Sequence, residues 1–280
     1  MKKITIAASA LAGVTAITAA GLYAIAPGIY DPHLAKPFNR RYFAHRGLYT
    51  EDKTIPENSL AAFKRATDAG YGMELDVQLS KDGSLVIYHD DNLRRIFNID
   101  KRINELTLEE LKELRLYGTE ESFPTLQEVL EVVNGRVPLI VELKPATGKK
   151  RIELCQKTLD ALKEYKERTG GDYCVESFDP FIVKWFKKNA PDIYRGQLTM
   201  AWDSYDSKIP YLMRKAMSLC LFNFAGRPHF IAYDRCNVPA ILGYTKKLGA
   251  QSVAWTSKNP EDCPGADTII FEFYEPPQGF

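Results

Sequence analysis

Residues 137–177 decide the fold: VPLIVEL (137–143) is followed by KKRIELCQKTLDALKEY (149–165) and then by YCVES (173–177). The first and last runs are short and almost continuously apolar, as expected of strands that are buried on both faces. The middle run has the length and pattern of a helix. Because parallel strands need a long connection of this kind, the stretch predicts a strand–helix–strand unit with parallel strands.

The same alternation continues on both sides of this unit. Nine strand candidates occur, at Tyr42–His45, Gly72–Leu79, Leu85–His89, Val137–Leu143, Tyr173–Ser177, Tyr194–Met200, Phe230–Tyr233, Ser252–Trp255 and Thr268–Phe271. Repeated units of this type indicate a parallel sheet with helices on both faces. We expect residues 41–280 to form one α/β domain, a TIM (β/α)₈ barrel; an open doubly wound sheet is the alternative.

The count of nine strands is one too many for such a barrel. Only residues 80–84 connect Gly72–Leu79 to Leu85–His89, and a parallel crossover needs a dozen or more residues. These two strands should therefore form an extra antiparallel hairpin with Asp82-Gly83 at its turn. That turn sets Asp76 opposite Tyr88 and brings His89 close to Glu74 and Asp76.

The N-terminal segment, residues 1–27, differs from the rest of the chain. After Lys2 and Lys3, residues Ile4 to Ala26 carry no charge and are long enough to span a hydrocarbon core of about 30 Å. We expect an N-terminal transmembrane helix, a linker over residues 28–40, and a catalytic domain outside the cytoplasm. The alternative is a cleaved signal peptide and a secreted protein, because Ala24-Ile25-Ala26 has the form of a cleavage site.

Composition excludes several classes of function. The formal net charge is +1, which gives no case for a nucleic-acid partner. The five cysteines are scattered and never have a Cys-x-x-Cys spacing, so they indicate neither a disulfide framework nor a zinc site. The sequence leaves the oligomeric state open.

Candidate catalytic residues lie where the predicted strands end, and the active sites of such barrels lie at the carboxyl ends of the strands. Two of only four histidines, His45 and His89, end apolar runs and are candidates for acid/base catalysis. Glu74 and Asp76 are two residues apart, so they share a face of their strand; with Glu142 they could bind one hard cation such as Mg²⁺, Ca²⁺ or Mn²⁺. The alternative for each histidine is a hydrogen-bonded framework residue.

Further polar residues at these strand ends suit a phosphate group. Arg46 and Lys144 are candidates for phosphate binding, and a structural ion pair is the alternative for both. Trp255 is either a substrate-binding wall or a core residue. Three more residues are expected to hold the catalytic and metal-binding side chains in position: Glu57, Asn58 and Asp90.

At these residues the sequence resembles the glycerophosphodiester phosphodiesterase family. The matching motifs are His-Arg-Gly (45–47), Pro-Glu-Asn-Ser (56–59), Glu-x-Asp (74–76), Ser-Lys-Asp-Gly (80–83), His-Asp (89–90), Pro-Thr-Leu (124–126), Glu-Leu-Lys (142–144), Glu-Ser-Phe (176–178) and Ala-Trp-Thr (254–256). The resemblance implies a TIM barrel, a divalent metal on Glu74, Asp76 and Glu142, and acid/base chemistry by His45 and His89. It also implies hydrolysis of glycerophosphodiesters to glycerol 3-phosphate and an alcohol.

Two positions depart from the family pattern. Ser59 stands where threonine is commoner, and Ile269-Ile270-Phe271-Glu272 stands where many members have Ile-Ile-Thr-Asp. The second departure suggests that the last strand recognises a different substrate group. Two other functions are compatible with the sequence: a lysophospholipase D-like enzyme that acts on membrane lipids, and a barrel that binds glycerophosphodiesters without turnover.

Overall fold

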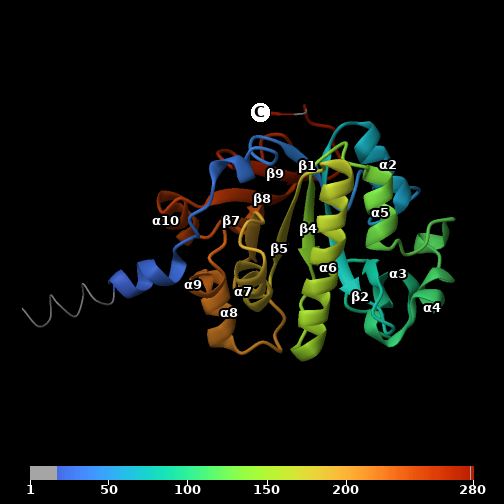
Figure 1. The fold of residues 1–280 in the computed structure, drawn as a ribbon, viewed down its shortest axis with the longest axis horizontal. Coiled ribbons are helices and arrows are strands. Elements are labelled where there is room, and N and C mark those ends of the chain that lie inside the picture. Colours follow the sequence, from blue (N-terminus) through green and yellow to red (C-terminus); the bar gives the residue numbers. More distant parts are fainter. Residues whose placement is uncertain (1–17, 278) are drawn as a thin grey trace, which may run out of the picture.

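The computed structural model describes residues 18–277 and 279–280. Its strands form one sheet in the order β1-β9-β8-β7-β6-β5-β4-β2-β3, and an additional β1–β2 pairing closes eight parallel strands into a barrel (Figure 1). The strands are β1 (Tyr42–Ala44), β2 (Gly72–Leu79), β3 (Leu85–Ile87), β4 (Leu139–Leu143), β5 (Tyr173–Ser177), β6 (Arg195–Thr199), β7 (Phe230–Asp234), β8 (Gln251–Ser257) and β9 (Thr268–Phe271). The closed barrel predicted from the sequence is confirmed, and the open sheet is excluded.

The ninth strand, β3, is the predicted hairpin partner of β2. It runs antiparallel to β2 in the register Val77 with Ile87 and Leu79 with Leu85. The backbone N–H of Tyr88 donates to the carbonyl oxygen of Asp76 at 3.0 Å, so the predicted register holds to the end of the hairpin. This register places His89 next to the acidic residues of β2.

Helices cover the outside of the barrel and of the β2–β3 hairpin. They are α2 (Leu60–Asp68), α3 (Arg94–Phe97), α4 (Leu108–Lys112), α5 (Leu126–Val133), α6 (Gly148–Thr169), α7 (Pro180–Asn189), α8 (Tyr211–Ser218), α9 (Asn223–Gly226) and α10 (Ile241–Lys247), with short 3₁₀ turns at Pro32–Ala35, Ile103–Glu105, Leu116–Gly118 and Arg235–Asn237. Capping boxes begin α4 at Thr107 and α5 at Thr125, where each threonine accepts a hydrogen bond from the third helical residue. The sequence carries the Thr-x-x-Glu motif of a capping box at both positions.

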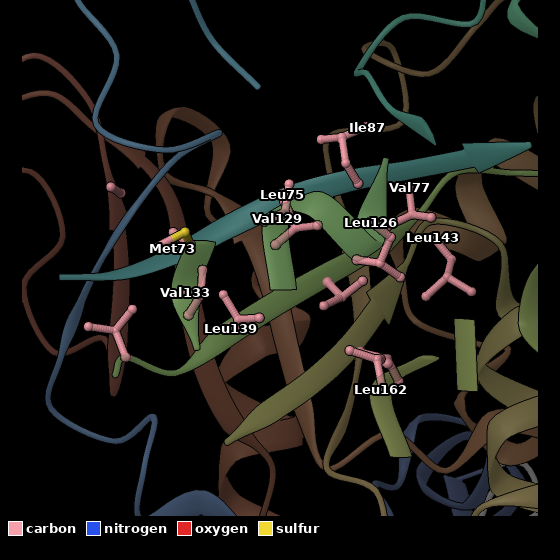
Figure 2. Close-up of a cluster of buried hydrophobic side chains, with 14 of the residues drawn as sticks. Met73, Leu75, Val77, Ile87, Leu126, Val129, Val133, Leu139, Leu143 and Leu162 are labelled. Carbon is pink, nitrogen blue, oxygen red and sulfur yellow. The ribbon is translucent and has the colours of Figure 1, made fainter. Parts of the chain in front are cut away.

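The alternation of side chains along the strands separates the core from the active site. On β2, Met73, Leu75 and Val77 point outward and pack against α5, as Figure 2 shows. Glu74 and Asp76 lie between them and point to the other face, into the barrel. The same strand therefore stabilises the barrel with one face and supplies carboxylates with the other.

The segment predicted as a linker, residues 28–40, is packed against the barrel instead. Ala35 and Phe38 are each 3% exposed, and Phe38 stacks on Phe43 of β1 and on Tyr194. The inward-facing apolar side chains of the strands leave a hydrophobic opening at the amino end of the barrel, and these residues cover it. The domain consequently begins before residue 41.

The predicted transmembrane helix at residues 1–27 lies largely outside the described residues. Of that segment, residues 18–25 are helical and lie beside α9 (Figure 1), where the Asn223 side chain donates to the Ile25 carbonyl oxygen at 2.9 Å. Within residues 18–277 and 279–280, no helix has the length and apolar character needed to cross a bilayer.

Residues 211–226 form two separate helices, α8 and α9. A turn at Cys220, with φ of 54°, separates α8 from α9. No residue of α8 is buried, and Leu212 is 79% exposed. This helix therefore presents apolar side chains to its surroundings.

Candidate active site

The carboxyl ends of the parallel strands surround a cavity of about 570 Å³. Residues of β2 and β4 and of the loops after β1 and β3 form one side of it, and residues of β5 to β9 and their loops form the other. Its lining includes His45, Glu74, His89, Glu142, Glu176 and Trp255. The structure thus brings together residues that are far apart in the sequence, at the end of the barrel where the sequence placed them.

Three buried carboxylates form the acidic centre of the site. Glu74, Asp76 and Glu142 are 3%, 0% and 6% exposed, and each offers an oxygen within 4.8 Å of the others. Asp76 and Glu142 are register partners on the adjacent strands β2 and β4. Such a set of hard oxygen donors fits a divalent cation of the Mg²⁺, Ca²⁺ or Mn²⁺ type.

Two cationic side chains lie against this cluster. Lys144 Nζ is 3.1 Å from Asp76 Oδ1 and 2.9 Å from Glu142 Oε1. The Arg46 backbone N–H donates to Glu74 Oε2 at 3.1 Å, and its Nε is 3.5 Å from Asp76 Oδ2. Both cations make ion pairs at the strand ends, and phosphate binding by them stays a prediction.

Burial and mutual repulsion set the protonation of the carboxylates. Burial, followed by the charges of Asp76 and Glu142, raises the pKa of Glu74 well above its usual value. Burial raises the pKa of Glu142 to about 7, although Lys144 opposes it. Burial also disfavours the charged form of Asp76, but Lys144, His89 and Arg46 outweigh it and hold that pKa well below its usual range.

These pKa shifts predict that cation binding depends on pH. A proton on Glu142 must leave before that carboxylate can bind a cation, so affinity should fall as pH drops below about 7, and binding near pH 7 should release protons. Calorimetric titration with Mn²⁺ in buffers of different ionisation enthalpy would measure this release. Glu164→Gln, an exposed substitution on α6, should leave it unchanged, and an affinity that is constant from pH 6 to 8 would contradict the prediction.

His45 is held by a carboxylate that the sequence did not identify as its partner. Its Nδ1 lies 2.5 Å from Glu272 Oε1 and its Nε2 lies 3.7 Å from Glu74 Oε2. Burial acts against ionisation of Glu272, but the His45 contact outweighs it and lowers the pKa of Glu272 to about 2. The ionised Glu272 can only accept, so Nδ1 donates and Nε2 keeps its lone pair. Burial lowers the pKa of His45, with Arg46 adding to the effect, which favours this neutral form.

His89 has a similar arrangement at the other side of the cluster. Its Nδ1 is 2.7 Å from Asp90 Oδ1, and the Arg95 Nε donates to Asp90 Oδ2 at 2.6 Å. Its side chain is 36% exposed, against 15% for His45. Burial lowers the pKa of His89, and the charge of Asp76 opposes that shift.

The residues that the sequence predicted to hold the catalytic and metal-binding side chains in position do lie next to those side chains. Asn58 Nδ2 donates to Asp76 Oδ2 at 2.8 Å. Glu57 is 4% exposed and accepts hydrogen bonds from Arg46 at 2.8 Å, Arg95 at 2.7 Å and Lys53 at 3.0 Å. Glu57 thus fixes the Arg46 guanidinium next to the cluster, while its catalytic importance stays a prediction.

Part of the far wall of the cavity is apolar. Phe178 and Trp255 meet edge to face with ring centroids 5.8 Å apart, and Leu198 adds to the same lining. Trp255 therefore faces the cavity as well as its neighbours in the barrel. Glu176 lies among these residues, 2% exposed, and burial raises its pKa well above the usual value, with a further contribution from Glu142.

Three residues of the site were not identified as functional candidates from the sequence: Arg95, Glu176 and Glu272. The position of Glu272 could have been derived, because it directly follows β9, and β9 pairs with β1 in the register Phe271 with Ala44. Glu176 is on the inward-facing side of β5. The alternation of side chains along that strand could have indicated this from the sequence. Arg95 lies on the short helix α3, and no pattern in the sequence points to it.

Comparison with known proteins agrees with this geometry. Residues 45–270 match the model of the glycerophosphoryl diester phosphodiesterase family. Over 248 residues the chain is 33% identical to a glycerophosphodiester phosphodiesterase of Caldanaerobacter subterraneus subsp. tengcongensis, which covers 81% of this chain and 91% of the relative. It is 29% identical to the lysophospholipase D GDPD1 of Rattus norvegicus, over 50% of this chain and 46% of that relative.

Solved structures show the same fold. A phosphodiesterase of Oleispira antarctica, solved in complex with the product sn-glycerol-3-phosphate, has a TM-score of 0.64 and 27% identity, covering 85% of this chain and 94% of that one. A glycerophosphodiester phosphodiesterase of Parabacteroides distasonis has a TM-score of 0.62 and 26% identity, covering 84% and 93%. With the barrel, the strand-end residues and the match over most of its length in agreement, the chain belongs to the glycerophosphoryl diester phosphodiesterase family of enzymes.

Proposed function

We propose that this enzyme hydrolyses glycerophosphodiesters to sn-glycerol 3-phosphate and an alcohol, with a divalent cation on Glu74, Asp76 and Glu142 and with His45 and His89 as acid/base catalysts. The observation that carries the proposal is the convergence of both histidines, Arg46 and Lys144 on the three buried carboxylates. A cation bound there would neutralise charge on the phosphate. Arg46 and Lys144 would bind the non-bridging phosphate oxygens.

The two histidines differ in a way that supports separate roles. His45, neutral and with Nε2 free beside the cluster, is suited to take the proton from the nucleophile, which is water or the glycerol 2-hydroxyl. His89 is more exposed, which suits protonation of an alkoxide that leaves toward solvent. Glu272 and Asp90 would orient the rings and stabilise the imidazolium forms.

The experiment that tests the function is a substrate panel with the purified enzyme. Glycerophosphocholine, glycerophosphoethanolamine, glycerophosphoinositol and a lysophospholipid would be incubated with and without chelator, and glycerol 3-phosphate would be quantified. We expect release from the water-soluble diesters. Release from the lysophospholipid alone, as lysophosphatidic acid, would favour the lysophospholipase D alternative, and no release from any compound would favour a binding protein.

We also propose that the N-terminal run, residues 4–26, holds the enzyme at a membrane with the catalytic domain outside the cytoplasm. Its lack of charge supports this, as do the exposed side chains of Leu22 and Tyr23 in the described part of the run. The chain should then sediment with membranes and resist carbonate extraction. A variant that begins at Pro27 should stay in the supernatant and keep its activity on water-soluble substrates, because the catalytic residues all lie beyond residue 41.

A mature protein that begins at Pro27 in the medium of expressing cells would instead show a cleaved signal peptide. Truncation at Pro27 is preferable to truncation near residue 41, since Ala35 and Phe38 are part of the folded barrel.

A further inference from the structure

Exposed apolar side chains are concentrated in one part of the described chain. More than half of the large ones lie in two short stretches, residues 22–29 and 211–224. The second stretch contains α8, which begins with Tyr211, Leu212 and Met213 and has no buried residue. Apolar residues that are exposed singly are ordinary, whereas a cluster of them marks an interaction surface. The two stretches are therefore candidates for such a surface.

Contacts join the two stretches into one surface, the α8–α9 surface (residues 22–29 and 211–224). The backbone N–H of Leu221 donates to the Ala216 carbonyl oxygen at 2.9 Å, so the segment that leads into α9 packs against α8. The Arg227 side chain, directly after α9, donates to the Tyr23 carbonyl oxygen at 2.9 Å and lies over the Tyr23 ring. Figure 1 shows α8, α9 and the helix at residues 18–25 on the same flank of the barrel.

The charge of this part of the chain has one sign. Residues 207–233 contain no aspartate or glutamate, and their charged side chains are all cationic: Lys208, Arg214, Lys215 and Arg227. Two aspartates precede the stretch, and one of them, Asp206, accepts a hydrogen bond from the backbone N–H of Lys208 at 2.9 Å. Exposed apolar side chains among cations fit a partner that is both apolar and anionic, as a bilayer with anionic lipids is.

Aromatic side chains lie where the apolar and cationic groups meet. Lys215 Nζ lies 3.9 Å from the centroid of the Trp202 ring, and Tyr211 packs edge to face on that ring with centroids 5.3 Å apart. Tryptophan and tyrosine are enriched at the level of the lipid headgroups, where one end of the side chain is apolar and the other is wet. Lysine stems lie along apolar surface there while the ammonium group stays in water.

A second copy of the chain fits this surface less well than a bilayer. A two-fold dimer buries the same patch of both copies. The cations of one copy would then face the cations of the other, with no acidic residue in the stretch 207–233 to pair with them. A surface that carries anionic phosphates has no such conflict.

The chain that precedes the described residues also favours a bilayer. Residues 4–17 carry no charge and lead directly into the helix at residues 18–25. That helix is joined to α9 by the hydrogen bond between Asn223 and Ile25. An uncharged run of this kind partitions into a bilayer, and it would bring the α8–α9 surface to the same bilayer.

We propose that the α8–α9 surface binds bilayers that contain anionic lipids, with Leu212 and Met213 among the acyl chains and Lys208 and Lys215 at the headgroup phosphates. The loop that leads into α8 begins at Met200, which lines the active-site cavity, so binding keeps the active-site end of the barrel near the bilayer. The surface is independent of the proposed N-terminal anchor, because residues 207–233 stay in the mature chain if the run is removed as a signal peptide.

Tryptophan fluorescence tests the proposal in the protein as isolated from expressing cells, either reconstituted into vesicles or added to them. The vesicles contain phosphatidylcholine with or without phosphatidylglycerol, and their brominated acyl chains quench tryptophans that enter the bilayer. The chain has three tryptophans, so quenching of Trp202 should remove about a third of the emission with phosphatidylglycerol present. Trp202→Phe should lose this quenching. Leu212→Ser should reduce it by about half or more, because inserted apolar area is lost.

Matched substitutions elsewhere serve as controls. Trp255→Phe removes a tryptophan of the active-site cavity and should leave the quenching of Trp202 intact. Ile152→Ser replaces an exposed apolar side chain on α6 and should behave as the wild type. Lys208→Gln should raise the phosphatidylglycerol content needed for half-maximal quenching, whereas Lys163→Gln on α6 should not.

Three results would each overturn the proposal. They are absence of quenching in the wild type, quenching that persists in Trp202→Phe, and equal quenching in Leu212→Ser and the wild type. Because Leu212 is exposed, Leu212→Ser should keep the wild-type Tm, and a loss of quenching then reports on the surface rather than on unfolding. A lipid-free dimer that Leu212→Ser converts to a monomer, without quenching by vesicles, would assign the surface to a second copy of the chain instead.

Discussion

His45→Ala and His89→Ala are each expected to lower kcat for glycerophosphocholine by about 10²- to 10⁴-fold, the usual loss when general acid/base catalysis is removed. The reason is geometric: both rings border the carboxylate cluster, and each is oriented by its own carboxylate. Release of glycerol 3-phosphate by the purified variants would be measured, with circular dichroism to establish that they are folded. Turnover near the wild-type value in either variant would remove that histidine from the mechanism.

The roles of the two histidines can be separated by the leaving group. p-Nitrophenolate leaves at neutral pH without being protonated, so a p-nitrophenyl ester of glycerol 3-phosphate needs no general acid. His89→Ala should therefore recover most of its activity on this ester, and His45→Ala should not. The opposite pattern would exchange the two assignments.

Glu272→Gln completes this series. A glutamine can still accept from His45 Nδ1 but cannot stabilise the imidazolium by charge, so kcat should fall and the acidic limb of the pH–rate profile should shift to lower pH. A purely structural role would lower the amount of folded protein without moving the profile. His33→Ala, which replaces an exposed histidine outside the barrel, is the matched control and should change nothing.

Removal of divalent cations is expected to abolish turnover, and Mg²⁺, Ca²⁺ or Mn²⁺ should restore it. Without a cation, Glu74, Asp76 and Glu142 present carboxyl oxygens at the place where an anionic phosphate needs positive charge. Activity after dialysis against chelator, followed by readdition of each ion, gives the measurement. Full activity in a preparation shown to be free of metal would disprove the site.

A second readout does not depend on catalysis. A cation that binds only the folded protein should raise Tm by mass action, and Glu142→Gln should reduce that rise because it removes one of three ligands. Glu164→Gln on the surface of α6 should show the wild-type shift. Equal shifts in wild type and Glu142→Gln would place the ion elsewhere.

The secondary structure of the barrel could be predicted from the sequence because local patterns determine it. Each of these patterns depends only on residues that are neighbours in the sequence. They are the continuous apolar strands, the capping boxes at Thr107 and Thr125, and a connection that is too short for a parallel crossover. One expectation was wrong for a reason that is not local. Residues 28–40 lack periodicity, but two of them, Ala35 and Phe38, are buried because they cover the apolar opening of the barrel.

The sequence by itself predicted an α/β barrel, with an open sheet left as the alternative, together with the hairpin register that brings His89 to Asp76 and the carboxylates at the strand ends, because strand period and strand ends are properties of adjacent residues. Only the tertiary structure decided which carboxylate orients His45, which residues hold Arg46 in place, and that Glu176 is buried without a partner. These facts depend on contacts between residues that are not neighbours in the sequence: the β1–β9 pairing joins residues 45 and 272, and Glu176 is buried inside the closed barrel. Distances between side chains on different strands are set by the shape of the whole barrel, which no short stretch of sequence contains.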